Sequence, residues 1–433
     1  MEAFLYDEGM FLGLSEHKLP RAVYGFALLG FALRLAVRLH SGAADFWENS
    51  YYFFFPLAQN IAQGNGITEA GGVPTAFRVP FYPIVLAGIT LGHQAFWPIV
   101  IAQSLIGAGT VVLAGALAVQ IFGRGARAAQ VAACAVALYP YYVIHDTALQ
   151  ETSLFTLLTL AAVVAMQHAA RGGTERWAAL GGVLLGLDTL TRATIAPFAL
   201  LAPLWLMRRK NARTGLLCLA CAAVVVSPWL WRNYRLTGSP VLSSEGGVQL
   251  WTGNNGYLFH FYPEQSSDLS KEEALNSLSA ADQRELEQLR TNEVNEDRWY
   301  RARALAYIEA HPGETAVNGL RKIAAGFYWL PSPRHGRVAD LVYAASYLPV
   351  MLAGLWGMWR RRGQWREDFL IYALYGTFAL LTAVFWAHTS HRVYLDVYWM
   401  VLGAGALTAV GGRRAAVQRE PGADAGGKSL VGG

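Results

Sequence analysis

Long apolar runs separated by short polar stretches organise this chain along most of its length. Most of these runs reach or approach the roughly 20 residues that a helix needs to cross the hydrocarbon of a bilayer. The expected spans are 21–39, 97–122, 126–144, 151–169, 176–191, 193–208, 214–231, 338–359, 367–387 and 393–411. The pattern predicts an all-α polytopic membrane protein with about ten transmembrane helices.

The apolar stretch 81–92 is short for a span. If it does not cross, the basic groups of the chain collect on one side, which the positive-inside rule identifies as the cytoplasm. These groups are His17–Arg21, Arg124/Arg127, Arg171/Arg176, Arg208/Arg209/Lys210/Arg213, Arg360/Arg361/Arg362/Arg366 and Arg413/Arg414. We therefore expect 81–92 to form a juxtamembrane or re-entrant helix on the outer face, with the N-terminus in the cytoplasm. Arg34 and Arg38, near the outer end of the first span, argue weakly against this topology.

Four regions follow from this topology. Residues 1–231 form an N-terminal membrane core with a first outer loop at 40–96, and residues 232–337 form an extramembrane segment on the outer face. That segment has the composition of two or three soluble helices and is expected to cover the membrane core. Residues 338–412 supply the last membrane helices, and 413–433 form a cytoplasmic tail expected to be disordered.

Composition agrees with a membrane protein. The chain is 54% apolar and 15% charged, whereas a soluble domain carries roughly 25% charged residues. Its basic residues lie in short loops between apolar runs, which indicates topology and not nucleic-acid binding. Cys134, Cys218 and Cys221 lie inside apolar runs without further ligands, so we expect neither disulfides nor a metal site there. No cleavable signal peptide is apparent in residues 1–21.

Ionisable residues gather at the expected outer face. Asp45 and Glu48 follow the first span, and Asp146 and Glu151 flank the next outer turn. Carboxylates near lipid depth are costly and usually mark a site. The basic residues on the same face are Arg78, Arg192, Arg232, Arg235 and Arg392. Each alone is also consistent with a solvated loop or a snorkelling side chain, but together they favour a site that binds a phosphate and moves a proton.

Displacing a lipid-linked phosphate from a sugar requires such a set. A carboxylate takes a proton from the incoming hydroxyl or amine, and positive groups stabilise the departing phosphate. Asp45 or Glu48 fits the base, and Arg78 and Arg232 fit the phosphate site. The apolar helix 81–92 could lie along the polyprenyl chain.

At these residues the chain resembles the GT-C class of polytopic glycosyltransferases, in particular the family 39-like branch of protein O-mannosyltransferases and lipid A aminoarabinose transferases. The similar stretches are "YYFFFPLAQNIAQGNGIT", "GGVPTAFRVPFYPIVLAG", "LYPYYVIHDTALQETSLFTLL", "GVLLGLDTLTRAT", "SPWLWRNYRLTGSPVLSSEGGVQLWTGNN" and "HTSHRVYLDVYWMVLGAG". The resemblance implies a polyprenyl-phosphate sugar donor, an inverting single displacement and an outer-loop carboxylate as base.

The resemblance also implies residue roles. Arg78 and Tyr82 stand in the family's Arg/Lys-x-Pro-x-Tyr-Pro segment, where the basic residue is expected to touch the donor phosphate. Arg392, in the closing stretch, is a further candidate for the donor phosphate. Asp146 and Glu151 are expected on the sugar or acceptor side, together with Arg192. The remaining substrate-binding candidates are Arg232, Asn233, Tyr234 and Asn254 with its neighbour Asn255.

The chain departs from the family pattern at two places. Asn49 and Ser50 stand where the family's acidic residue usually lies, so the base is divided between Glu48, which is nearer and slightly preferred, and Asp45. Asp396 stands where the family tends to have proline, and we assign it no role.

The predicted function is transfer of a sugar at the outer face of the cytoplasmic (inner) membrane, with a lipid, glycan or protein as acceptor and membrane lipid as surroundings. A transporter or lipid-linked glycan flippase is the alternative, and an enzyme that uses a diphosphate-linked glycan is a variant of the first. Nothing in the sequence requires a cofactor. His388 and His391 alone are too few to define a metal site, and the use of a divalent cation stays open.

Overall fold

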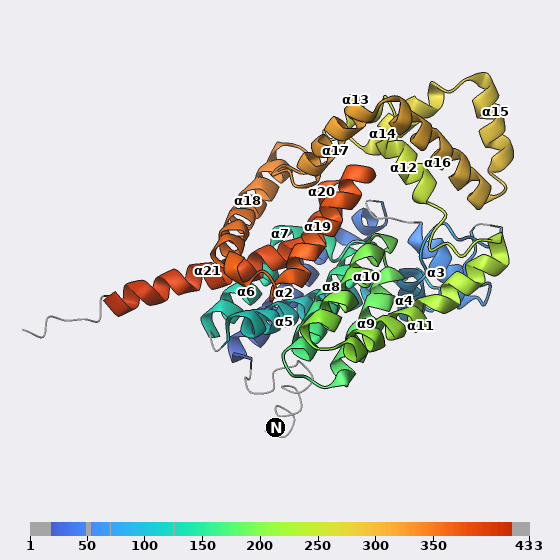
Figure 1. The fold of residues 1–433 in the computed structure, drawn as a ribbon. Helices are drawn as coiled ribbons and strands as arrows, with labels where there is room; N and C mark the ends of the chain where they lie inside the picture. The colour runs from blue at the N-terminus through green and yellow to red at the C-terminus, as the bar shows by residue number, and fades with distance from the viewer. Residues whose placement is uncertain (1–18, 49–52, 70, 124–125, 418–433) are drawn as a thin grey trace, which may run out of the picture.

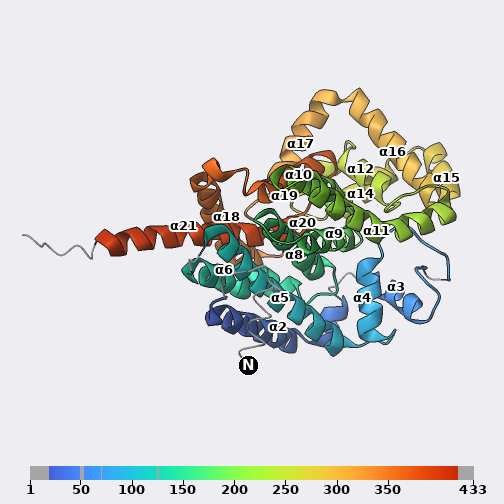
Figure 2. The same cartoon turned by 60° about the horizontal axis from the view of Figure 1, so that its bottom comes forward.

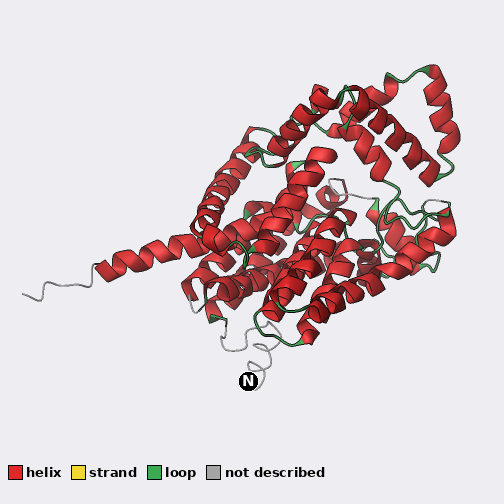
Figure 3. Cartoon of the chain, viewed as in Figure 1, coloured by secondary structure: helices red, strands yellow, loops and turns green. Residues whose placement is uncertain are grey.

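The structure is a computed structural model, and it describes residues 19–48, 53–69, 71–123 and 126–417. Within these ranges the regular structure is helical, apart from one isolated β-bridge between Thr68 and Pro74 (Figure 3). Asn49, Ser50, part of the N-terminal basic group and most of the C-terminal tail lie outside the described residues.

The N-terminal half forms a bundle of apolar helices joined by short turns (Figure 1). Its helices are α2 (Arg21–Glu48), α3 (Phe54–Ala62), α4 (Phe81–Thr90), α5 (Phe96–Phe122), α6 (Ala126–Leu138), α7 (Pro140–His145), α8 (Thr152–Ala170), α9 (Glu175–Thr189), η1 (Ala193–Ile195), α10 (Ala196–Arg209) and α11 (Ala212–Thr237). In Figure 2, α2, α5 and α6 lie side by side, in agreement with their mutual contacts.

The C-terminal half first leaves the bundle and then returns to it. Its helices are α12 (Gly246–Gly253), α13 (Leu258–Phe261), α14 (Ser267–Asn276), α15 (Ala280–Leu289), α16 (Glu293–Ala310), α17 (Pro312–Gly326), α18 (Arg337–Arg360), η2 (Arg362–Gln364), α19 (Phe369–Val384), α20 (Thr389–Arg392), η3 (Val393–Leu395) and α21 (Asp396–Val417). Helices α12 to α17 lie over one end of the bundle (Figure 1).

Five helices in the described ranges are long and apolar enough to cross a bilayer, namely α2, α5, α8, α11 and α18. Helices α4, α6 and α19 are apolar but shorter, and the expected spans 176–191, 193–208 and 393–411 correspond to α9, α10 and α21. These apolar helices confirm an all-α, multi-pass membrane protein. Helix α4 has 10 residues, so it is about 15 Å long, half of what a span requires.

A kink at Gly42 redirects the end of α2. The φ angle of Gly42 is +79°, a conformation that residues with a Cβ rarely adopt. The last turn therefore leaves the axis of the apolar helix. It carries Phe46, which is buried against the ring of Phe96, and it carries Asp45 and Glu48 at the rim of the bundle.

The segment α12–α17 has a small core of its own. Leu250 and Trp251 of α12 pack with Trp299 and Tyr300 of α16, and all four side chains are buried. Side-chain oxygens cap three of the helices in this segment, at Ser266, Ser279 and Asn292. The segment lies over one end of the bundle (Figure 1).

Candidate active site at the bundle rim

Asp45 is held at the rim by an arginine of its own helix. Arg38 Nη1 lies 2.8 Å from Asp45 Oδ2, and Arg38 Nε donates to Thr147 Oγ1 at 3.0 Å. Arg38 is nearly buried, whereas the side chain of Asp45 is 42% exposed. Arg38 therefore links a half-exposed carboxylate to the turn between α7 and α8. Glu48, the last residue of α2, is exposed.

Asp146 forms a buried ion pair with Arg34, which lies one helical turn before Arg38 on α2. Arg34 donates to Asp146 Oδ2 from Nη2 at 2.7 Å and from Nε at 3.0 Å. Gly107 of α5 leaves room for this pair, because a Cβ there would overlap the guanidinium. Burial raises the pKa of Asp146, and the charge of Arg34 opposes that change. The pair fastens the α7–α8 turn to α2.

Glu151 and Arg192 form a second, partly exposed pair. Arg192 donates to Glu151 Oε1 from Nη2 at 2.6 Å and from Nε at 3.0 Å, and the two side chains are 16% and 14% exposed. The guanidinium also lies 4.9 Å from the ring centroid of Phe155. The pair joins the start of α8 to the loop after α9.

Arg78 is paired with Glu245, a residue to which the sequence analysis gave no role. Its Nη1 lies 2.7 Å from Glu245 Oε2, and its guanidinium lies 4.7 Å from the ring centroid of Phe53. Glu245 Oε1 accepts a hydrogen bond from Gln249 at 2.5 Å. Among the described residues, the buried Nε of Arg78 has no acceptor. Arg78 thus keeps one donor unused beside a carboxylate.

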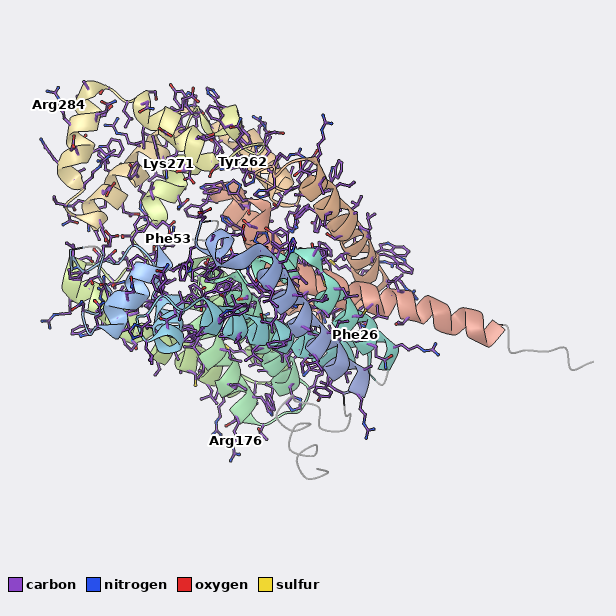
Figure 4. The ribbon with its side chains drawn as sticks, turned by 180° about the vertical axis from the view of Figure 1, so that it is seen from behind. Phe26, Phe53, Arg176, Tyr262, Lys271 and Arg284 are labelled. Carbon is purple, nitrogen blue, oxygen red and sulfur yellow. The ribbon has the colours of Figure 1, made fainter. Side chains whose placement is uncertain are left out.

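The pairs Arg78–Glu245 and Glu151–Arg192 lie close enough for their charges to influence one another. Burial raises the pKa of Glu245; Arg78 opposes this and the charge of Glu151 adds to it. Burial also lowers the pKa of His391 well below its usual value, and Arg192 lowers it further. We call Arg78, Glu245, Glu151 and Arg192 the twin-pair cluster. In Figure 4, Phe53, next to Arg78, lies between the bundle and the α12–α16 segment, while Arg176 lies at the opposite end of the bundle.

The loop that carries Arg78 is clamped from several sides. Arg232 donates from Nη1 to Thr75 O at 2.5 Å and from Nη2 to Ile67 O at 2.8 Å. Glu293 Oε2, at the start of α16, accepts from Ala76 N at 2.9 Å. The segment α12–α17 therefore fixes the backbone next to Arg78. Arg232, expected at the phosphate, donates to backbone carbonyls of this loop instead.

The two residues that follow Arg232 differ in burial and contacts. Asn233 is fully buried; it accepts from Arg232 and donates to Val241 O at 2.8 Å. Tyr234 is 48% exposed and stacks loosely near Trp231. Of the three consecutive candidates, Arg232 holds the loop of Arg78, Asn233 supports Arg232, and Tyr234 is exposed.

Arg392 lies in a buried network. Its Nε donates to Asp396 Oδ1 at 3.1 Å, its Nη2 donates to Tyr343 Oη at 2.6 Å, and its guanidinium lies 3.6 Å from the ring centroid of Tyr347. Tyr139 donates to the other oxygen of Asp396 at 2.9 Å. Because Arg392 has no exposed surface, its guanidinium reaches no donor phosphate in this conformation. Asp396, left without a role, is its counter-ion.

Tyr82 and Asn254 occupy different surroundings. Tyr82 is buried on α4, with its ring 4.9 Å from that of Phe54. Burial raises the pKa of Tyr82, and the charge of Glu151 raises it further. Asn254 is buried between α12 and α19, where it donates to Leu250 O and Val384 O at 2.8 and 2.7 Å. Tyr82 thus adjoins the twin-pair cluster, whereas Asn254 connects two helices.

His388, just before α20, and His391, within α20, differ in their contacts. His388 Nδ1 lies 3.0 Å from Ser332 Oγ, and burial lowers its pKa to about 4. His391 adjoins Trp386, with ring centroids 5.4 Å apart. Over the described part of the chain, no three His, Cys, Asp or Glu side chains are grouped so as to hold a metal ion.

The structure therefore unites some of the expected residues and separates others. Arg78, Glu151 and Arg192 come together. Arg38 joins Asp45 to the α7–α8 turn, and Arg34 binds Asp146 within that turn. Sequence reasoning missed Glu245, which precedes α12 in the quoted stretch "SSEGGVQ". It also gave no site role to Arg34 and Arg38, although their four-residue spacing inside an apolar run places both on one helix face.

Comparison with known proteins adds three findings. Residues 79–231 match a family model described as dolichyl-phosphate-mannose-protein mannosyltransferase, which bears out the resemblance over about a third of the chain. No curated protein matches the sequence. The apo crystal structure of the Archaeoglobus fulgidus oligosaccharyltransferase is similar in fold, with a TM-score of 0.53 at 14% identity.

That similarity covers 93% of this chain and 52% of the archaeal one, so the chain spans about half of that protein. It confirms the GT-C-like architecture. A crystal structure of ArnT from Cupriavidus metallidurans bound to undecaprenyl phosphate also matches, with a TM-score of 0.41 and 14% identity over 91% of this chain and 80% of that one.

Proposed function

We propose that this protein is a membrane glycosyltransferase that takes a sugar from a polyprenyl-phosphate donor, with inversion, at the outer face of the cytoplasmic membrane. The twin-pair cluster carries the proposal. It gathers two arginines and two carboxylates at the bundle rim, and the loop that carries Arg78 is clamped from the extramembrane segment. The family model that matches residues 79–231 is named for a dolichyl-phosphate-linked sugar, which supports a donor of this kind.

Arg78 is the group proposed to bind the donor phosphate. Its side chain is 34% exposed, its Nε lacks an acceptor among the described residues, and its Nη1 holds a carboxylate that a phosphate oxygen could replace. A guanidinium binds phosphate through parallel N–H donors, so one incoming oxyanion could use both nitrogens. Arg192, paired with Glu151 close by, is proposed to line the same site.

Asp45 is the base that the contacts favour. Arg38 orients it and joins it to the α7–α8 turn, and that turn leads directly to Glu151. In the proposed step Asp45 takes the proton of the acceptor hydroxyl or amine, which attacks the anomeric carbon from the face opposite the phosphate. The bond between that carbon and the phosphate oxygen breaks, and the polyprenyl phosphate leaves with the electron pair, stabilised by Arg78.

The test is transfer by the protein in lipid from a polyprenyl-monophosphate sugar to an envelope extract. Arg78→Gln should lower transfer by about a hundredfold or more, the usual loss when a group that stabilises developing charge is removed. Arg235→Gln is the matched control, because Arg235 is exposed nearby on α11 and contacts Trp231. Full activity of Arg78→Gln would contradict the phosphate site. Movement of the intact lipid-linked sugar across sealed vesicles, with no covalent product, would instead identify a transporter.

The same assay separates the two candidate bases. Asp45→Asn should lower the rate constant by roughly 100-fold or more, the range for loss of a general base, whereas Glu48→Gln should change it by much less. If Glu48→Gln is the inactive variant and Asp45→Asn retains transfer, the base is Glu48.

A further inference from the structure

A second basic site lies at the far end of the bundle from the twin-pair cluster. A cavity of about 170 Å³ lies where α5, α18 and α21 meet, lined by Phe122, Gly357, Arg360, Arg361, Gly405 and Ala409 among others. Helix α18 begins after α17 and runs about 36 Å to Arg360, so the cavity lies across the thickness of a bilayer from the extramembrane segment.

Close helix packing gives the cavity fixed walls. Gly405 lies against the ring of Phe122, where a Cβ would overlap the ring atoms, and Gly357 lies against the backbone of Leu402 in the same way. Small residues that let helix backbones approach are typical of packing inside membranes. The cavity is therefore bounded by backbone and aromatic atoms that have little freedom to move into it.

Arg360 and Arg361 supply the charge, and they are engaged differently. Arg361 donates to both oxygens of Asp368, at 2.7 and 3.0 Å, so its charge is balanced. Arg360 donates from Nη1 to Ala406 O at 3.2 Å, and this is the acceptor it finds among the described residues. Arg360 thus retains donors that face no carboxylate.

The surrounding turn is basic overall. Residues 360–368 contain four arginines and two carboxylates, a net charge of four minus two, or +2. The cavity is therefore complementary to an anion.

Apolar side chains lie beside the two arginines of the cavity. Phe122 and Ala409 line it, and the ring centroid of Trp356 lies 5.3 Å from the guanidinium carbon of Arg360. Ala409 is exposed, and Phe122 and Trp356 are half-buried. On a membrane-spanning helix such side chains face the acyl chains of the lipid. Charged donors in a cavity and an apolar wall beside it match the two parts of a phospholipid.

We propose that this cavity binds the phosphate of an anionic phospholipid, with Arg360 as the principal donor and the acyl chains along Phe122, Trp356 and Ala409. Basic pockets between membrane helices on the cytoplasmic side bind anionic headgroups by this combination of charge and apolar contact. The apolar wall favours a lipid over a soluble phosphate, because free phosphate gains nothing from it.

The test measures retention of phosphatidylglycerol against phosphatidylcholine by native mass spectrometry of the full chain. Arg360→Gln should weaken phosphatidylglycerol binding about tenfold, the effect of losing one charge-assisted hydrogen bond, and leave phosphatidylcholine binding unchanged. Arg362→Gln is the matched control: it removes the same charge from the same turn, but Arg362 is exposed and donates to Trp359 O. It should change binding less than about twofold.

A second variant and a competitor keep the test decisive. Ala409→Phe should fill the cavity without changing charge and should also release phosphatidylglycerol, so the two variants must agree. Equal binding by Arg360→Gln and the unmodified protein, or equal losses in Arg360→Gln and Arg362→Gln, would overturn the proposal. Displacement of the lipid by inorganic phosphate at matched concentration would show a soluble-anion site and would overturn it too.

Discussion

At the residue scale, Arg78 faces a carboxylate in this structure, and a donor phosphate would have to replace it. Glu245 is only 14% exposed and is also held by Gln249. Because burial raises the pKa of Glu245, it takes up a proton at higher pH than an ordinary glutamate does. Protonated Glu245 no longer competes for Arg78, so lowering the pH should free the guanidinium.

This gives a prediction about donor affinity. The affinity of the unmodified protein for a polyprenyl-phosphate sugar should rise as pH falls through the raised pKa of Glu245. Glu245→Gln should bind more tightly at neutral pH, by about tenfold, with little dependence on pH in that range. A phosphodiester donor is the suitable ligand, because it keeps its single charge over this range. A parallel pH dependence in both proteins, measured by titration in nanodiscs, would rule out competition by Glu245.

At the scale of elements, the segment α12–α17 positions the loop of Arg78. Glu293 Oε2 accepts from Ala76 N at 2.9 Å and from Ser244 Oγ at 2.8 Å. Glu293→Ala removes both contacts, so Arg78 should be misplaced and KM for the donor should rise several-fold while the melting temperature changes little. Glu285→Ala is the control, because Glu285 accepts from Trp299 in the same segment but does not touch this loop. Unchanged KM in Glu293→Ala, or an equal rise in Glu285→Ala, would contradict the clamp.

The helices were predictable, because an apolar run long enough to cross a bilayer is visible in the local sequence. The expected spans 97–122 and 151–169 agree with α5 and α8 to within about a residue at each end, and the short helix 81–92 appears as α4. The pairings were not predictable, because they join distant parts of the chain. Arg34 and Asp146 are 112 positions apart, and nothing near Arg78 in sequence announces Glu245.

The same reason explains why some arginines were expected at the phosphate and are found elsewhere. An arginine at the end of an apolar run has the same local pattern whether it binds a ligand or a backbone carbonyl. Arg232 holds the carbonyls of Thr75 and Ile67, and Arg392 is enclosed with Asp396. Only the fold decides which guanidinium keeps unused donors.

At the scale of the whole molecule, one buried lysine joins the segment α12–α17 to the bundle. Lys322 of α17 has no exposed surface and donates to Gly253 O at 3.0 Å, to Val384 O at 3.3 Å and to Asn254 Oδ1 at 3.4 Å. It therefore ties α17 to the end of α12 and the end of α19. All its acceptors are neutral, so the ammonium is buried without a counter-ion among these contacts. Burial lowers the pKa of Lys322 to about 8.

The uncompensated charge should make the attachment of this segment depend on pH. Between pH 8 and the ordinary pKa of 10.5, the unfolded chain holds a proton on Lys322 that the folded protein has released. The stability contributed by this site should therefore increase as pH rises through that window, by roughly 3 kcal/mol in total, and stay constant below it. The difference in free energy of unfolding between the unmodified protein and Lys322→Met isolates the effect, since other titrating groups cancel. Lys271→Met is the control, because Lys271 is a partly exposed partner of Asp268 on the same segment. A difference that does not change between pH 8 and 10.5 would mean that Lys322 stays charged in the folded state and that its neutral acceptors are sufficient to hold it.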